Sequence, residues 1–299
     1  MIRVDQRLVP AFFAALAAVA VLSIMDAMMK HLVLAIGIVA VSVWRSVVSV
    51  GIGAALYLPR RRGWPTRRTL AFHVARAMVV TLLATLFFWG IARVPLAQAI
   101  ALTFIAPLIA MLLAAVLLGE RVGGRSIAGS IVAFAGVIVI VVGQARIAIG
   151  HDALLGIAAI IGSALTYAVN IVMMRRQAIS ARPLEINFFQ SLTVAALWLA
   201  ALPLVGLPQW PAGQWSWILG AAALSTTGTL VFAWAYARGP ASYLAVTEYS
   251  AFLWAALMGW LVFREHVSSD TIVGAGLIIG GCLIAARRKR SPLPEIAAG

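Results

Sequence analysis

Charged residues are scarce in this sequence, acidic residues are scarcer still, and there is one cysteine. Of the 299 residues, 11% are charged and 63% are hydrophobic, whereas an ordinary soluble domain carries about 25% charged residues. A soluble fold could not bury that much apolar surface, so lipid must be the main solvent. The single Cys282 excludes a disulfide framework within one chain and any multi-cysteine metal site. No metal site is predicted either from the four scattered histidines, which are His31, His73, His151 and His266.

No glycine-rich phosphate loop or Walker sequence is found, so ATP is not expected to drive any activity and no cofactor is predicted. The formal net charge is +14, which in a soluble protein would suggest a nucleic-acid partner. Here the basic residues lie between apolar runs rather than on one element. We therefore expect no nucleic acid as a partner, but a lipid bilayer and a small-molecule substrate. A homodimer is compatible with the sequence.

What the chain does contain is a series of long apolar runs. Crossing a hydrocarbon core of about 30 Å takes roughly 20 apolar residues in a helix. The runs are continuously apolar rather than alternating, which favours helices over barrel strands. The sequence thus predicts an all-α membrane protein with ten transmembrane helices, at about residues 9–29, 34–58, 70–91, 95–118, 126–143, 153–174, 184–204, 214–236, 241–263 and 270–286.

The distribution of Lys and Arg predicts the orientation, because cytoplasmic loops carry the excess of positive charge. With the N-terminus in the cytoplasm, inner segments hold 17 of the 23 basic residues and outer segments hold 4. The other two, Arg45 and Arg76, fall inside helices. We expect a multi-pass protein of the cell inner membrane with both termini in the cytoplasm.

The two halves of the chain resemble each other at one offset of 145 residues, with no gap. Each copy has five predicted helices, an odd number, so the second copy must be inserted upside down. Inverted repeats of this kind are typical of alternating-access transporters, whose site lies near the midplane between the halves. We divide the chain into a first repeat at 1–145, a second, inverted repeat at 146–290 and a cytoplasmic tail at 291–299. The offset places Trp89, Ala92, Arg93 and Pro95 on Trp234, Ala237, Arg238 and Pro240, and Glu120, Gly129 and Gly136 on Glu265, Gly274 and Gly281.

A helix with a central proline, then Leu-Gly-Glu-Arg, then a glycine-spaced helix, occupies residues 102–137. This pattern resembles the EamA-type transporters of the drug/metabolite transporter superfamily, over nearly the whole chain. The second copy departs from it, with Phe252 in place of Pro107. The resemblance implies a carrier of metabolites such as amino acids, nucleoside-like compounds, vitamins or drugs. The segments WRS at 44–46 and HVAR at 73–76 are similar to the subgroup of riboflavin and S-adenosylmethionine uptake proteins.

Four ionisable residues are predicted inside helices: Asp26, Arg45, Arg76 and Glu248. A charge at the centre of a membrane helix costs about 2.5–3.5 kcal/mol on insertion scales, so such residues usually face a cavity or pair with each other. None of the four recurs at the equivalent position of the other half, where Glu248 corresponds to Thr103. They therefore serve either substrate binding and coupling or local ion pairing.

Glu248 is the foremost candidate, because small residues share its helical face and can open a cavity. Its alternative role is a structural pair with Arg45 or Arg76. Arg45 could hold a carboxylate or phosphate bidentately or pair with Asp26. Arg76 lies nearer the cytoplasmic end, where it could snorkel to the interface. Glu120 and Glu265 sit at equivalent helix ends and are expected to cap or pair at a loop.

Polar and aromatic residues within the helices could line the pocket of a flat organic ligand, although each of them also has an ordinary packing role. A mid-helix proline frees a carbonyl and can kink the helix, so Pro107 is either a gating hinge or a fixed bend. The pocket candidates are Gln98, Thr103, Tyr167, Asn170, Gln190, Tyr243 and Trp254.

We expect a secondary transporter, and not an enzyme, that moves a small polar metabolite by alternating access, with riboflavin or a similar heteroaromatic compound as the first substrate hypothesis. Export of amino acids or related metabolites is the alternative. A membrane-embedded enzyme would need clustered catalytic acids or histidines at one interface, which the sequence lacks. A channel-like subunit would not require an asymmetric set of intramembrane charges.

Overall fold

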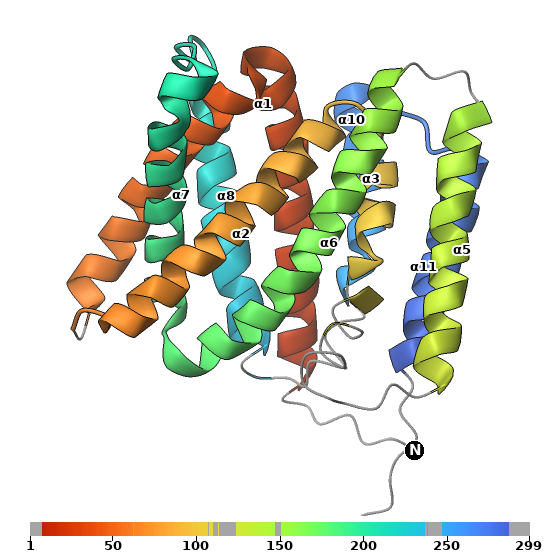
Figure 1. Ribbon diagram of the computed structural model, residues 1–299, viewed down its shortest axis with the longest axis horizontal. Coiled ribbons are helices and arrows are strands. Elements are labelled where there is room, and N and C mark those ends of the chain that lie inside the picture. The colour runs from red at the N-terminus through yellow and green to blue at the C-terminus, as the bar shows by residue number, and fades with distance from the viewer. Residues whose placement is uncertain are drawn as a thin grey trace, which may run out of the picture.

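The computed structural model describes residues 8–61, 63–106, 108–109, 113, 124–146, 151–236, 238 and 247–286. Every regular element in these ranges is helical, which confirms the all-α prediction (Figure 1). The helices are α1 Leu8–Tyr57, η1 Leu58–Arg60, α2 Arg67–Ile91, α3 Leu96–Thr103, α5 Gly124–Arg146, α6 His151–Ser180, α7 Pro183–Val205, α8 Trp215–Tyr236, α10 Ala251–Phe263 and α11 Ser269–Ala286.

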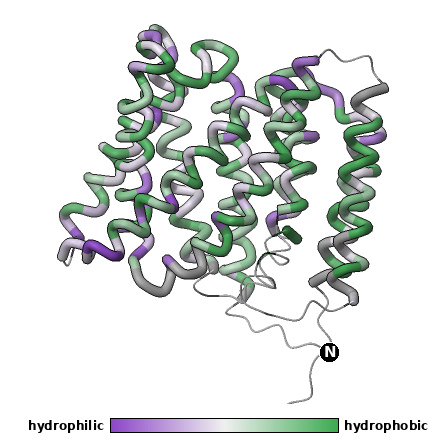
Figure 2. The backbone as a smooth tube through the Cα atoms, in the orientation of Figure 1, coloured by the Kyte–Doolittle hydropathy of each residue, from purple (hydrophilic) through white to green (hydrophobic). Residues whose placement is uncertain are grey.

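Five of these helices, α1, α2, α6, α7 and α8, are long and apolar enough to cross a membrane. Figure 2 shows them hydrophobic over much of their length, with hydrophilic residues both at their ends and within them. The chain is therefore a multi-pass membrane protein, and the exact number of ten spans stays a prediction.

Helix α1 consists of two legs joined at Gly37. The backbone of Gly37 has φ 78° and ψ 161°, a conformation that side chains other than glycine's rarely adopt. The sequence predicted an interruption at residues 30–33 instead. Those residues remain helical, so Lys30 lies within the first leg. The prediction was wrong here because an apolar run does not indicate which glycine will turn the chain.

Helices α3 and α10 adjoin tight turns at positions that the repeat relates. The turns lie at Phe104–Ile105 and Tyr249–Ser250, 145 residues apart. Backbone bonds reach three residues back, from Phe104 N to Ala101 O at 3.2 Å and from Ser250 N to Thr247 O at 3.0 Å. The rings of Phe104 and Tyr249 meet edge to face, with centroids 5.4 Å apart. Equivalent residues of the two copies are therefore in contact.

These turns correct the prediction of continuous helices at 95–118 and 241–263. Pro107 has no N–H to offer the carbonyl of residue 103, which favours the first interruption. The second copy has Phe252 there, so proline is not its cause. Instead the Ser250 hydroxyl donates to Thr247 O at 2.6 Å, and such side-chain bonds compete with the helical ladder.

Helices α5 and α11 lie side by side at one edge of the molecule and pack through glycines (Figure 1). A Cβ on Gly274 would lie 2.7 Å from the carbonyl oxygen of Gly136, and a Cβ on Gly281 would collide with the carbonyl oxygen of Gly129. Gly129 and Gly274 are repeat equivalents, as are Gly136 and Gly281. The pairing is thus crosswise and antiparallel, which is what a two-fold relation between inverted copies requires.

A second pair of interfaces follows the same offset. Where α2 crosses α6, a Cβ on Gly90 would lie 2.5 Å from Ile160 Cγ1. The equivalents of Gly90 and Ile160 are Ala235 on α8 and Ala15 on α1, which form a buried cluster with Ala11. Small residues at such crossings let membrane helices approach closely.

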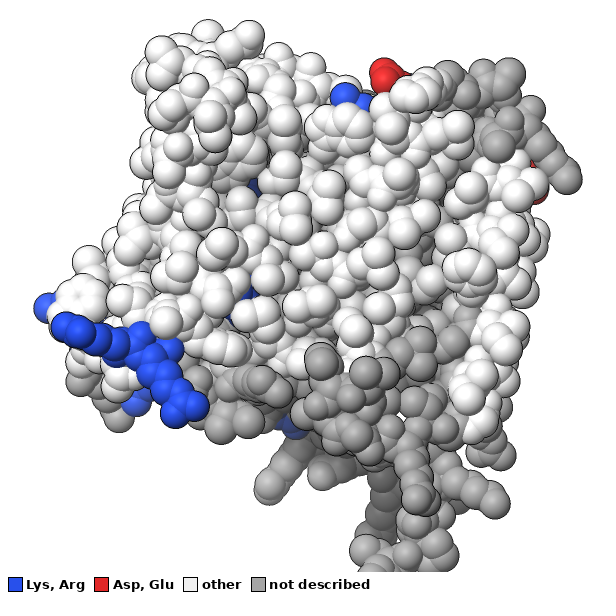
Figure 3. Space-filling model, viewed as in Figure 1, with Lys and Arg blue, Asp and Glu red and all other residues white. Residues whose placement is uncertain are grey.

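Exposed basic residues gather at the end of the molecule where α1 passes into α2 (Figure 3). We call this the basic end, defined by Arg60, Arg61, Arg67 and Arg68, all of which are exposed. Helix α2 starts there, so the segment that follows α2, with Val94, lies at the opposite end.

Candidate functional site

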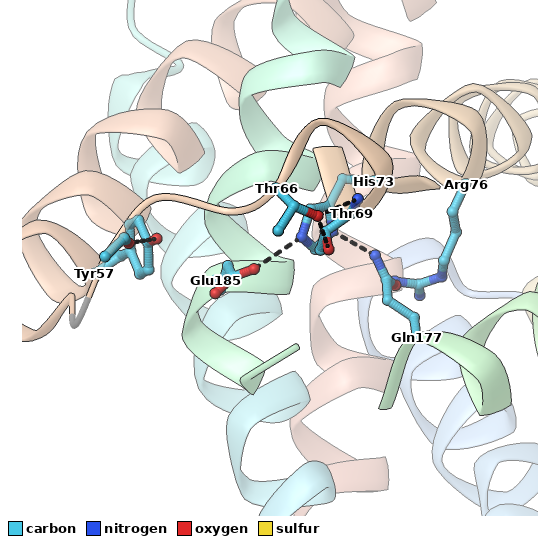
Figure 4. Close-up of polar contacts among 8 residues, drawn as sticks. Tyr57, Thr66, Thr69, His73, Arg76, Gln177 and Glu185 are labelled. Carbon is cyan, nitrogen blue, oxygen red and sulfur yellow. Dashed lines mark hydrogen bonds and ion pairs between the residues drawn. The ribbon is translucent and has the colours of Figure 1, made fainter. Parts of the chain in front are cut away.

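A polar chain crosses from α2 to α6 and α7 in the half of the molecule nearer the basic end (Figure 4). Arg76 Nε donates to Asn170 Oδ1 at 2.9 Å, and Arg76 Nη1 donates to Gln177 Oε1 at 2.6 Å. Gln177 Nε2 lies 2.5 Å from His73 Nδ1, and His73 Nε2 lies 3.1 Å from Glu185 Oε1. Arg76 is buried among these partners, so it does not snorkel to the interface.

Tyr167 lies on α6, three residues before Asn170. It interacts electrostatically with both Arg76 and Glu248. Glu248 immediately precedes the turn at Tyr249–Ser250. Three predicted site residues, Arg76, Tyr167 and Asn170, therefore come together, and Glu248 lies at the edge of the same group.

A second group lies between the two legs of α1 and α2. Asp26 and Arg45 interact electrostatically, although no hydrogen bond joins them among the described residues. The Arg45 guanidinium lies over the ring of Phe88, 5.8 Å from its centroid, as in a weak cation–π contact. Arg45 Nε is buried and has no hydrogen-bond partner in the described part of the chain.

Gln98 on α3 is 1% exposed, and within the described ranges neither its Oε1 nor its Nε2 has a hydrogen-bond partner. A buried polar group left unsatisfied costs about 1–3 kcal/mol. Such a group in a native protein calls for an explanation, and a ligand or water that enters the site is one. Gln98 and Arg45 thus offer unused donors and acceptors within the described part of the helical core.

At the end opposite the basic end, a buried ion pair holds three elements together. Lys30 Nζ pairs with Glu265 Oε1 and donates to Val94 O at 2.7 Å. Glu265 Oε2 accepts from Leu96 N at 2.8 Å, at the start of α3, where a carboxylate is favourable. The expected capping or pairing role of Glu265 is confirmed, while Glu120 lies outside the described residues.

The other predicted site residues are less engaged. The Thr103 hydroxyl donates to Ile100 O at 2.7 Å, within its own helix. Gln190 on α7 and Trp254 on α10 are half-buried, and neither is joined by a hydrogen bond to the two polar groups above in the described structure. Tyr243 and Pro107 lie outside the described residues.

The sequence did not predict the polar partners Gln177, His73, Glu185 and Lys30. The sequence singled out His73 as part of the HVAR segment and as one of four scattered histidines, and it placed Lys30 in a loop. The spacing of His73 and Arg76 on one helix, three residues apart and on one face, is the signal that was available. Their partners come from other helices, and sequence spacing does not reveal them.

Two copies of one helical unit, with interrupted helices meeting between the copies near buried charges, form the architecture of a secondary transporter. The sequence matches the EamA-like transporter family twice, over residues 9–142 and 154–287. The chain belongs to this family, and the two matches are offset by the same 145 residues as the internal repeat. It is accordingly a transporter and not an enzyme.

Two curated relatives are named as transporters. The pseudopaline exporter CntI of Pseudomonas aeruginosa is 26% identical over 276 residues, covering 90% of this chain and 93% of the relative. The riboflavin transporter of Vibrio cholerae serotype O1 is 26% identical over 244 residues, covering 78% and 79%. A solved crystal structure shares the fold with a TM-score of 0.61 at 21% identity, covering 93% of this chain and 96% of the other.

Proposed function

We propose that the chain is an alternating-access carrier of a small polar organic metabolite, which binds between the two repeats at the Phe104–Tyr249 contact. The observation that carries the proposal is the meeting of the two interrupted helices beside Glu248. Interrupted helices expose backbone groups and mark the binding sites of many secondary transporters. The two repeats, taken as 1–145 and 146–290, would rock against each other around this point.

In this proposal the basic end faces the cytoplasm of a cell whose inner membrane holds the chain, with both termini on that side. The exposed arginines at the basic end support this orientation, because basic loops are retained in the cytoplasm. The buried Lys30–Glu265 pair then closes the outer end of the carrier.

Riboflavin or a similar heteroaromatic metabolite is the first substrate hypothesis. Flat heteroaromatic ligands present several acceptors and a few donors, which match the unused amide of Gln98 and the unused Nε of Arg45. Phe88 under Arg45 and the Phe104–Tyr249 pair supply aromatic surface of the kind that lines such pockets. The riboflavin transporter among the relatives supports this hypothesis.

An exporter of amino acids or related metabolites is the second candidate, and one observation favours it. Asp26 and Arg45 place an acid beside a base, an arrangement that suits a zwitterion. The exporter among the relatives is in keeping with outward transport. We assign Arg45 to substrate binding and Glu248 to coupling in either case.

The test is counterflow in proteoliposomes that contain the purified full chain. Liposomes preloaded with unlabelled riboflavin should accumulate radiolabelled riboflavin with saturable kinetics, whereas empty liposomes should not. A parallel series uses a panel of zwitterionic amino acids. Counterflow with amino acids alone would replace the first substrate hypothesis by the second. A non-saturable flux for every compound would contradict the carrier proposal and favour a channel.

A further inference from the structure

The polar chain from Arg76 to Glu185 has a single direction, which the chemistry of its members determines. Arginine carries hydrogen-bond donors and no acceptor, so the atom of Gln177 that faces Arg76, at 2.6 Å, must be Oε1. The amide nitrogen of Gln177 therefore faces His73 Nδ1 at 2.5 Å. An amide nitrogen only donates, so Nδ1 must be an acceptor and carries no proton. The ring proton lies on Nε2, which donates to Glu185.

A proton added to His73 at Nδ1 would break this pattern. Nδ1–H would then face the N–H groups of Gln177, and two donors would meet. Gln177 can avoid this by turning its amide over, so that Oε1 accepts from His73. The amide nitrogen would then face Arg76, where again two donors would meet. Because Arg76 and His73 approach opposite ends of the amide, Gln177 can serve Arg76 or a protonated His73, but not both.

We propose that His73 is the proton-sensing residue of the carrier and that its protonation releases Arg76 from Gln177. This inference rests on the proposed function, since it takes Arg76 to belong to the transport site. Arg76 would keep Asn170 and gain freedom to move toward Tyr167 and Glu248, with which it is linked electrostatically through Tyr167. His73 is a positioning residue here, because it acts on the site through Arg76.

The groups that face His73 come from three elements. Glu185 from α7 accepts from the ring, and Arg76 lies behind Gln177. The end of α1 and the segment that follows contribute Tyr57, which interacts electrostatically with Glu185 and Arg61. The Phe189 ring stacks on His73, with centroids 5.3 Å apart, and carries no charge. His73 is 1% exposed and Glu185 is 17% exposed, so Glu185 is the member of this pair that reaches the surface.

A direct test uses nuclear magnetic resonance of the full chain in lipid nanodiscs, with nitrogen-15 in histidine and arginine. Histidine ordinarily changes charge between about pH 5 and 8. As the pH falls through this range, we expect the Nδ1 resonance of His73 to report protonation. The guanidinium resonances of Arg76 should shift with the same midpoint. The variants His73→Asn and Arg76→Lys assign the two sets of signals.

Gln177→Glu separates the switch from a general effect of pH. A carboxylate accepts from both sides, so His73 should still protonate while the Arg76 resonances stay constant. His266→Asn, which alters an exposed histidine between α10 and α11, should leave both titrations unchanged. Protonation of His73 without any shift of Arg76 in the unaltered chain would overturn the proposal. A His73 Nδ1 that already carries its proton at the high-pH limit would do the same.

Transport provides an independent arm. Riboflavin counterflow by the unaltered chain should change severalfold across the same pH range, and the His73→Asn variant should remain at the high-pH level throughout. A His73→Asn variant that keeps the full pH response would contradict the role of His73. The resonance titration needs no substrate, so a chain that fails to move riboflavin but shows coupled titrations would refute the substrate hypothesis and leave the switch supported.

Discussion

The close packing of α5 on α11 leads to a sharp prediction about two adjacent glycines. A Cβ on Gly281 would lie 2.7 Å from Ala133 N and 2.9 Å from Ala133 Cβ, while a Cβ on Gly280 would meet nothing within 4 Å. The nearest atoms to Gly281 belong largely to the backbone of α5, so no side-chain rotation can relieve the overlap. Gly281→Ala must push the two helices apart, whereas Gly280→Ala need not move anything.

The expected difference follows from two opposing effects. Alanine in place of glycine within a helix stabilises by about 0.5–1 kcal/mol, and both variants gain this. Overpacking a close contact costs typically about 1–3 kcal/mol, and only Gly281→Ala incurs it. The comparison of the two variants cancels the propensity gain. Gly281→Ala should therefore be less stable than Gly280→Ala by about 1–3 kcal/mol.

The assay is the apparent unfolding temperature of the purified variants in one detergent, followed by tryptophan fluorescence. At about 2–4 °C per kcal/mol for a chain of a few hundred residues, the gap between the variants should be about 2–12 °C. Gly136→Ala, on the repeat-equivalent glycine, should resemble Gly281→Ala, because its Cβ would lie 2.5 Å from Gly274 O. Equal unfolding temperatures for Gly280→Ala and Gly281→Ala would refute the crosswise packing of the two repeats.

Four further substitutions and one fusion test the site and the topology. Arg45→Lys should weaken transport although it keeps the charge, because lysine lacks the planar fork of arginine, and normal transport kinetics would remove Arg45 from the site. Glu248→Gln should leave the chain folded and able to exchange substrate but abolish accumulation driven by a pH gradient, and full accumulation in proteoliposomes would exclude a coupling role. Glu265→Gln should destabilise the chain by up to about 3–5 kcal/mol, because it leaves the Lys30 charge buried without its partner. The added change Lys30→Met should recover part of that loss in thermal unfolding, and equal losses in single and double variants would contradict the ion pair. A reporter active only in the periplasm, fused after Arg290, should give no signal, and a strong signal would reverse the proposed orientation.

Hydropathy and the repeat carried most of the fold prediction. Every backbone group in the membrane must form its hydrogen bonds within the protein, so spanning segments are continuous apolar helices. Such apolar runs can be identified directly from the sequence. The repeat offset of 145 residues could also be identified from the sequence, since Trp, Arg, Pro and Glu rarely recur together at one spacing by chance. The turns inside these runs could not be predicted from the sequence. Gly37 turns the chain through its backbone conformation, and Ser250 acts through one hydrogen bond of its hydroxyl, and both lie within apolar sequence.

The chain's composition and periodicity by themselves determined that this is an all-helical membrane protein of two repeats, with a small set of ionisable residues inside it. Only the tertiary structure decided which of these residues meet. Arg76 could have paired with Glu248, but it donates to Asn170 and Gln177 on α6 instead, and His73 reaches Glu185 across 112 positions of sequence. A hydrogen bond depends on distances of about 3 Å and on direction, and helix packing alone brings residues so far apart in sequence within that range.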